Sequence, residues 1–239
     1  MRYFEREAWL AKAVKSPRDA FELFMSPGMV EIAVEEMNTR IESTIAEVTK
    51  EHLLLDHMPY IKTTTDCEMY ALFGLMCFRG LLGLNSHSVA AFFSDRTGNP
   101  LFGGTMSKNG YKFLASHLSF DDASTRPQRW KKDRFAAFRD FFDIFNGNCS
   151  RHLLPNEYLS LDETLYPMRN HVSFKQYNPN KPAKYGVLFK SMNDTCYSYT
   201  YQSLVYAGKP TELPSPYYVS GTENYIKELM TKLSQAVVL

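Results

Sequence analysis

Cysteine is scarce in this sequence, and its spacing excludes two common uses of the residue. The four cysteines, Cys67, Cys77, Cys149 and Cys196, form no Cys-x-x-Cys pair and have no histidine at the spacing of a structural zinc site. We interpret them as reduced, packed thiols, which are typical of proteins inside the cell.

Long hydrophobic runs are also missing. The most apolar run, residues 70–84, is interrupted by Arg79 and is shorter than the roughly 20 residues that cross a bilayer, so we predict a buried helix there. Residues 1–14 include Glu5 and lack the apolar centre of a secretory signal. These absences predict an intracellular protein, nuclear or cytoplasmic, that is not secreted and has no membrane partner.

The sequence has no strong excess of charge of either sign. Its 27 Lys and Arg residues and 26 Asp and Glu residues give a formal net charge of +1, whereas a protein that coats nucleic acid is strongly basic. Affinity for DNA therefore requires a local cluster of cations. One such cluster lies within residues 169–190, a stretch without any acidic residue. The cations that we predict to contact DNA phosphates are Arg169, Lys175, Lys181 and Lys184.

Aromatic residues accompany these cations. Phe174, Tyr177 and Tyr185 lie in the same stretch, and their pattern fits either a hydrophobic core or the flank of a bound nucleic acid.

A short strand-like segment carries the best candidate for a metal ligand. Over residues 158–165, Tyr-Leu-Ser-Leu-Asp-Glu-Thr-Leu, polar and apolar side chains alternate with the period of a β-strand. Asp162 falls on the polar face and Glu163 on the apolar face. Asp162 is therefore the better ligand for a divalent cation that acts on phosphodiesters.

The same region resembles a known family. The order Ser160-Leu-Asp-Glu, Met168-Arg169, Ser173-Phe-Lys-Gln-Tyr and Asn180-Lys-Pro-Ala-Lys-Tyr-Gly is similar to the start of the catalytic domain of piggyBac-type DNA transposases. The resemblance implies a ribonuclease H-like fold of the DDE superfamily and a nuclear role in DNA transposition. It also implies three aspartates that bind Mg²⁺ or Mn²⁺, the first of which is Asp162.

Two departures from the family pattern shape our expectation of activity. The family's second aspartate lies in an Asp-Asn-Trp-Phe segment after the helix that matches residues 223–235, but this sequence ends at Leu239 and neither Trp9 nor Trp130 follows Asp-Asn. The family's Arg-Gly-Arg also reads Arg169-Asn-His here. We therefore expect the later aspartates and the family's cysteine-rich zinc module to be missing.

A single carboxylate cannot bridge and orient two metal ions, so we expect a catalytically inactive, truncated transposase without a bound cofactor. Asp162 would then be vestigial, and would bind metal only if the missing aspartates were supplied. The carboxylates weighed as substitutes, none of which matches a family position, are Asp194, Glu212 and Glu223.

Three alternatives remain open at this point. The chain is a fragment of an active cut-and-paste transposase, a domesticated DNA- or protein-binding module, or an unstable translated fossil. An open sheet edge beside the Asp162 strand would also allow a protein partner or self-association.

The fold class that we expect is α+β. A partial transposase domain over residues 17–239 comprises a helical region over 17–150 and an incomplete ribonuclease H-like core over 151–239, with three strands and one helix. Helices are predicted over 17–50 with a break at Pro27-Gly28, over 66–84 with Asp66 as cap, over 86–93, from Ser107, and from 128 to an end at Asn146-Gly-Asn. Strands are predicted over 158–165, 185–192 and 197–206, with a turn at Asn193-Asp194, before a helix with a Ser220 and Glu223 capping box.

Overall fold

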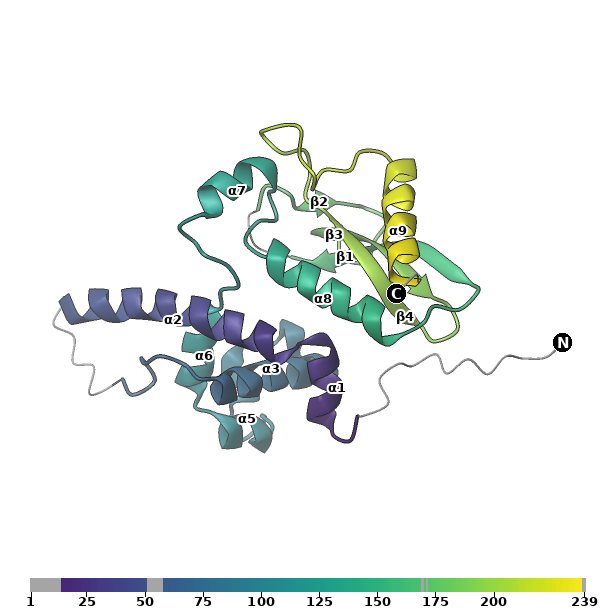
Figure 1. Ribbon diagram of the computed structural model, residues 1–239. Helices are drawn as coiled ribbons and strands as arrows, with labels where there is room; N and C mark the ends of the chain where they lie inside the picture. Colours follow the sequence, from purple (N-terminus) through teal and green to yellow (C-terminus); the bar gives the residue numbers. More distant parts are fainter. Residues whose placement is uncertain (1–13, 51–57, 169, 171, 238–239) are drawn as a thin grey trace. The chain divides into compact units, whose positions relative to one another are not determined.

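The computed structural model describes residues 14–50, 58–168, 170 and 172–237 (Figure 1). The chain folds into two compact units, one of residues 27–121 and one of residues 1–26 with 122–239. In this division the helix Pro17–Phe24 contacts the helix Arg139–His152, which in turn packs on the sheet.

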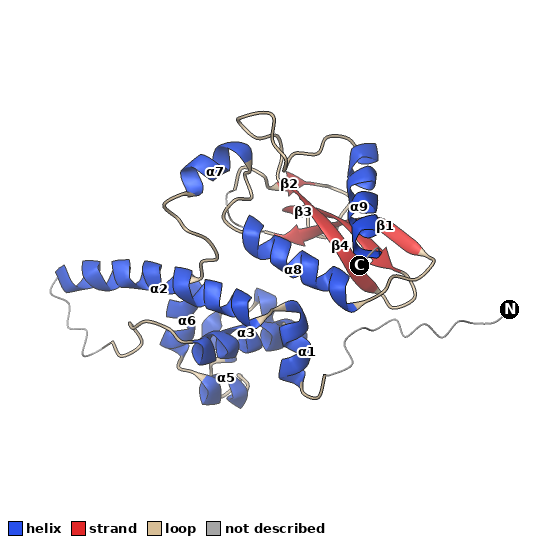
Figure 2. Ribbon diagram, in the orientation of Figure 1, coloured by secondary structure: helices blue, strands red, loops and turns tan. Residues whose placement is uncertain are grey.

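The unit of residues 27–121 is built from helices. Within residues 27–50 and 58–121 every regular element is helical (Figure 2). Aromatic side chains form much of its core, with the Phe92 and Phe102 ring centroids 4.7 Å apart. The elements are α2 (Pro27–Lys50), α3 (Asp66–Leu81), the short 3₁₀ helix η2 (Leu84–Ser86), α4 (Val89–Phe92), α5 (Pro100–Thr105) and α6 (Lys108–His117).

The second unit combines helices with an antiparallel sheet. Its first helix begins with a capping box in which the Ser16 hydroxyl accepts from the backbone N–H of Asp19 while the Asp19 carboxylate accepts from that of Ser16. The elements are α1 (Pro17–Phe24), α7 (Arg126–Lys132), α8 (Arg139–His152), β1 (Leu159–Pro167), β2 (Gln176–Tyr177), β3 (Tyr185–Asp194), β4 (Tyr199–Tyr206) and α9 (Thr222–Val237).

Strand β3 is the centre of the sheet. It pairs along its length with β1, from Leu159 opposite Asp194 to Pro167 opposite Gly186, and it also pairs with β4 and with the short β2. Among the described strands β1 pairs only with β3, which leaves the other edge of β1 open. The α+β class is confirmed, and β1, β3 and β4 match the three predicted strands, but the short β2 between the first two was not predicted.

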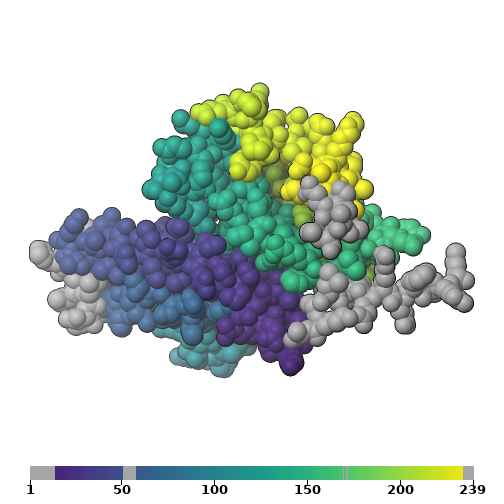
Figure 3. All heavy atoms as spheres, in the orientation of Figure 1, coloured from purple at the N-terminus to yellow at the C-terminus, as the bar shows by residue number. Residues whose placement is uncertain are grey.

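The two faces of the sheet have separate hydrophobic clusters. On one face Val187 and Val205 pack with Phe135 and Phe142, which lie just before and within α8. Alternate residues of β3 point to the opposite face, where Met192 packs with Leu229 of α9. Figure 3 shows α9, in yellow, at the surface of this unit.

The helix predicted from residue 128 is in fact two helices. α7 ends at Lys132, and α8 starts at Arg139 after a turn in which the Asp133 carboxylate accepts from the backbone N–H of Phe135 at 2.9 Å. The predicted end at Asn146-Gly-Asn is wrong, since α8 continues to His152. Asn146 and Asn148 are buried, and their side chains bond to other elements instead of ending the helix.

Other local predictions also need correction. Thr65 caps α3 in place of Asp66, accepting from the backbone N–H of Glu68. The β3–β4 turn lies at residues 195–198, and the Asp194 carboxylate stabilises it by accepting from the backbone N–H groups of Cys196 and Tyr197. The capping box of Ser220 and Glu223 stays a prediction; in the structure α9 begins at Thr222, and the Glu223 carboxylate pairs with Lys227 at 2.7 Å.

The expected packing of the thiols holds for one cysteine. Cys149 is buried, whereas Cys67, Cys77 and Cys196 are exposed. The break at Pro27 and the start of α6 after Ser107 agree with the sequence pattern. Among the described helices, none combines the length and the apolar character that crossing a membrane requires.

Candidate functional site

Asp162 lies in the middle of β1 on an exposed part of the sheet. It is directly opposite Ser191 of β3, which in turn is opposite Ser203 of β4. Directly paired residues of antiparallel strands point to the same face, so the three form a polar row across the sheet. The hydroxyl groups of Ser191 and Ser203 are buried and 2.8 Å apart. Asp162 is therefore the exposed, anionic end of an otherwise neutral row.

Asn146 of α8 fixes the other end of this row. Its side-chain oxygen accepts from the backbone N–H of Ser203, and its amide nitrogen donates to the Ser203 carbonyl oxygen, both at 2.8 Å. The same nitrogen is 2.8 Å from Oε1 of Gln202. Because Asn146 is buried, these bonds hold α8 in register with β4.

The side chains of Glu163 and Asp162 lie on opposite faces of the sheet. It lies opposite Lys190, and Lys190 Nζ is 2.9 Å from Glu163 Oε1. Lys190 Nζ also lies 4.5 Å from the ring centroid of Tyr225 in α9. Glu163 therefore belongs to the α9 face, as the sequence alternation predicts, and its charge is already balanced.

The other acids weighed as metal ligands have structural partners elsewhere. Asp194 is fully buried, and besides the turn it accepts from the backbone N–H of Asn156 at 2.7 Å. Glu212 pairs with Lys131 at 3.5 Å, and Glu223 pairs with Lys227. Within the residues that the structure describes, no three His, Cys, Asp or Glu side chains gather closely enough to hold a metal ion.

The predicted basic residues lie around the connection between β2 and β3. Lys184 is exposed, and Lys175 Nζ is 5.6 Å from the ring centroid of Tyr185. Lys181 is half-buried and donates to the Glu163 carbonyl oxygen at 2.7 Å, which ties this connection to β1. Arg169 lies outside the described residues.

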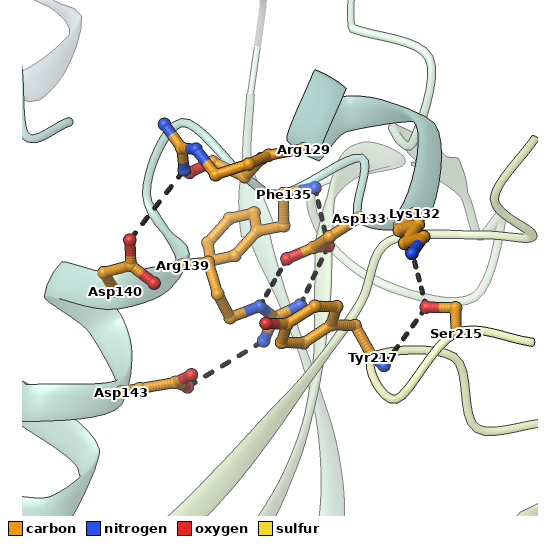
Figure 4. A network of polar contacts seen from close by, with 10 residues as sticks. Arg129, Lys132, Asp133, Phe135, Arg139, Asp140, Asp143, Ser215 and Tyr217 are labelled. Atoms are coloured by element: carbon orange, nitrogen blue, oxygen red, sulfur yellow. Dashed lines mark hydrogen bonds and ion pairs between the residues drawn. The ribbon is translucent and has the colours of Figure 1, made fainter. Parts of the chain in front are cut away.

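The sequence pattern did not reveal the polar cluster that precedes α8 (Figure 4). Arg139 is 8% exposed, and its Nε and Nη2 donate to the Asp133 carboxylate at 2.6 and 3.1 Å. Its guanidinium carbon lies 5.2 Å from the centroid of Phe135 and 5.1 Å from that of Tyr217. Ser215 then donates to the Lys132 carbonyl oxygen at 2.6 Å. The cluster holds the segment between β4 and α9 against the α7–α8 turn.

Comparison with known proteins identifies the family. A family model described as Transposase IS4 matches residues 16–238, which is nearly the whole chain. The chain belongs to this transposase family. Its resemblance to piggyBac-type transposases is confirmed by both curated relatives and a solved structure.

Two human proteins are similar to this family member over 82% of its length. They are PiggyBac transposable element-derived protein 3 and the Chimeric ERCC6-PGBD3 protein, each 26% identical over 200 residues. The matched segment covers 30% of the first and 17% of the second. The chain therefore spans less than a third of the length of these relatives.

A cryo-EM structure of a piggyBac transposase synaptic complex with hairpin DNA has the same fold over most of this chain. The TM-score is 0.78 with 28% sequence identity, and the match covers 92% of this chain and 44% of the other. The match agrees with a ribonuclease H-like fold of the DDE type.

Proposed function

We propose that this piggyBac-type chain binds DNA through the basic β2–β3 region and does not cleave strands by itself. The observation that carries the proposal is the setting of Asp162, an exposed carboxylate whose partners across the sheet are the neutral Ser191 and Ser203. By resemblance Asp162 is the first of the family's aspartates. The position suits a metal ligand, but Asp162 supplies only one carboxylate.

The family is generally metal-dependent, so a cleavage site in this chain would have to hold Mg²⁺ or Mn²⁺. Two-metal strand cleavage requires several carboxylates that converge on ions roughly 3.5 to 4 Å apart. The Asp162 carboxylate accepts from the backbone N–H of Glu163 at 2.7 Å, Glu163 and Asp194 are engaged in other contacts, and no cluster of three acidic, His or Cys side chains forms among the described residues. This donor set does not fit the metal pair, and we assign no cleavage step to it.

DNA binding is supported by the placement of the cations. Lys175 and Lys184 flank the exposed end of the β2–β3 connection, and Lys181 anchors that connection to β1. Together with Arg169, these lysines are the proposed contacts to DNA phosphates. Such a role would place the protein in the nucleus.

A cleavage assay with labelled hairpin DNA and Mn²⁺ tests the first part of the proposal. We expect no cleavage above background from the purified chain, and the same result from the Asp162→Asn variant. Cleavage by the purified chain that Asp162→Asn abolishes would overturn the proposal. It would favour an active transposase in which other carboxylates complete the site.

The open edge of β1 supports a second candidate, a protein-binding module. No described strand pairs with this edge of the nine-residue β1, although at its middle the Glu163 carbonyl accepts from Lys181 and the Glu163 N–H donates to Asp162 Oδ1. Such edges accept a strand from another chain. Size-exclusion chromatography with light scattering tests self-association. A concentration-dependent dimer that Leu161→Pro abolishes, while circular dichroism stays unchanged, would favour this candidate.

A further inference from the structure

Two exposed tyrosines meet at the paired ends of β2 and β3. Tyr177 and Tyr185 are directly opposite each other, their ring centroids are 4.8 Å apart, and the planes are inclined by 41°. Their side chains remain 57% and 56% exposed. Phe174, by contrast, packs against Phe135 in the core at 5.8 Å, so the aromatics of this segment have separate roles.

The backbone beneath the tyrosine pair is firmly held. The Tyr185 carbonyl oxygen accepts from the backbone N–H of Met168, and the backbone N–H of Asn178 donates to the Lys184 carbonyl oxygen at 2.9 Å. Next to Tyr185, a Cβ at Gly186 would collide with the Tyr166 carbonyl oxygen, so β1 and β3 approach closely there. The two rings therefore project from a rigid base, which lowers the entropic cost of binding a ligand on them.

Positive charge adjoins the rings. Lys175 Nζ lies 5.6 Å from the Tyr185 ring centroid, and the exposed Lys184 precedes Tyr185 in the chain. No acidic residue occurs between positions 169 and 190. Exposed aromatic rings beside cations that can bind a phosphate backbone match the chemistry of an unpaired nucleotide.

We infer that Tyr177 and Tyr185 form a stacking platform for unpaired bases of a DNA single strand, with Lys175 and Lys184 on its phosphates. The inference rests on the proposed function and adds the form of DNA that this site prefers. Duplex DNA keeps its bases stacked inside and offers the platform only phosphates. The site therefore discriminates single strands from duplexes.

The platform also has a defined relation to Asp162. Tyr185 is six positions from Ser191, the residue opposite Asp162, so both lie on the same face of the sheet. At ~3.3 Å per residue the separation along β3 is about 20 Å. A stacked strand advances ~3.4 Å per nucleotide, so about six nucleotides would span this distance.

The test measures binding by fluorescence anisotropy, with a labelled single strand of mixed sequence and with the matching duplex. The strand is about twelve nucleotides long, twice the number that spans the distance to Asp162. Tyr177→Ala and Tyr185→Ala should each weaken single-strand binding about tenfold and leave duplex binding within about twofold. Tyr177→Phe keeps the ring and should bind like the unchanged chain. Tyr197→Ala removes another exposed tyrosine, 43% exposed, from the β3–β4 turn and is the matched control.

The outcomes separate this inference from the proposal on which it rests. The stacking platform would be overturned if Tyr177→Ala and Tyr177→Phe lost the same affinity for the single strand. It would also be overturned if the alanine variants lost as much affinity for the duplex as for the single strand. If the alanine variants bind normally while Lys175→Ala and Lys184→Ala weaken binding, the platform is wrong and DNA binding stands. If the unchanged chain binds neither probe, both fall. Circular dichroism of each variant confirms that a loss does not reflect unfolding.

Discussion

Glu163 and Lys190 lie directly opposite each other on β1 and β3, and Lys190 is only 15% exposed while it forms both the ion pair and the contact with Tyr225. One side chain thus joins the strand that carries the candidate ligand to the central strand and to α9. The pair also keeps Glu163 on the face opposite to Asp162. The relationship therefore supports the sheet and limits the charges available at the candidate site.

Removing this lysine should destabilise the sheet unit. We expect Lys190→Ala to lower the free energy of unfolding by about 1–3 kcal/mol, because a partly buried ion pair and a cation–π contact are lost together. Urea unfolding followed by circular dichroism measures the change. Lys227→Ala is the control, since its pair with Glu223 is 67% and 80% exposed, and it should cost about 0.5 kcal/mol or less. Equal costs for both variants would contradict the role of Lys190.

The buried guanidinium of Arg139, at the start of α8, gives a stronger prediction. Arg139→Ala should cost about 3–5 kcal/mol, since it leaves the Asp133 carboxylate, 3% exposed, without a cationic partner. Arg139→Lys should recover part of this loss, because an ammonium keeps the charge but not the two-pronged geometry. Thermal unfolding of both variants shows which of them loses more stability. A cost for Arg139→Ala no greater than that of Arg18→Ala, an exposed helix-surface pair with Glu22, would show that the cluster is not structural.

Asn146 should be sensitive to truncation. Asn146→Ala removes the partners of the Ser203 N–H and carbonyl groups in a buried setting, and we expect a loss of about 2–4 kcal/mol. The control is Asn224→Ala, which removes one exposed bond to the Ser220 carbonyl oxygen and should cost about 0.5 kcal/mol. Urea unfolding would refute the assignment if the two variants matched.

Thiol chemistry should separate the four cysteines. Burial raises the pKa of Cys149 to about 11, so far less of it is thiolate at pH 8 than of an ordinary thiol with a pKa near 8.5. We expect three thiols to react quickly with a disulfide reagent and the fourth only after addition of denaturant. Rapid reaction of all four in the native chain would contradict the burial of Cys149.

The sequence predicted those features that depend on local pattern. Alternation along β1 placed Asp162 and Glu163 on opposite faces, and Pro27 marked the break between α1 and α2. The family resemblance, carried by motifs between residues 160 and 186, predicted the sheet and is confirmed by the family match.

The remaining features depend on contacts between distant residues. Asn146 reads as a helix end in sequence, but its partner lies 57 positions away in β4. Thr65 rather than Asp66 caps α3 because the cap depends on the backbone angle of one residue. Exposure of Tyr177 and Tyr185 likewise depends on strand pairing and on what Phe174 buries nearby. No periodicity in the sequence contains this information.

The central claim is that this chain binds DNA through the cations of the β2–β3 region, and the salt dependence of affinity tests it most directly. We would measure the dissociation constant for a duplex over a series of KCl concentrations. The chain with both Lys175→Ala and Lys184→Ala should show a log–log slope smaller by about two, because two phosphate contacts are lost. Lys62→Ala, an exposed lysine of the helical unit, should leave the slope unchanged. Affinity that does not depend on salt, or a slope that is the same in all three proteins, would contradict the account.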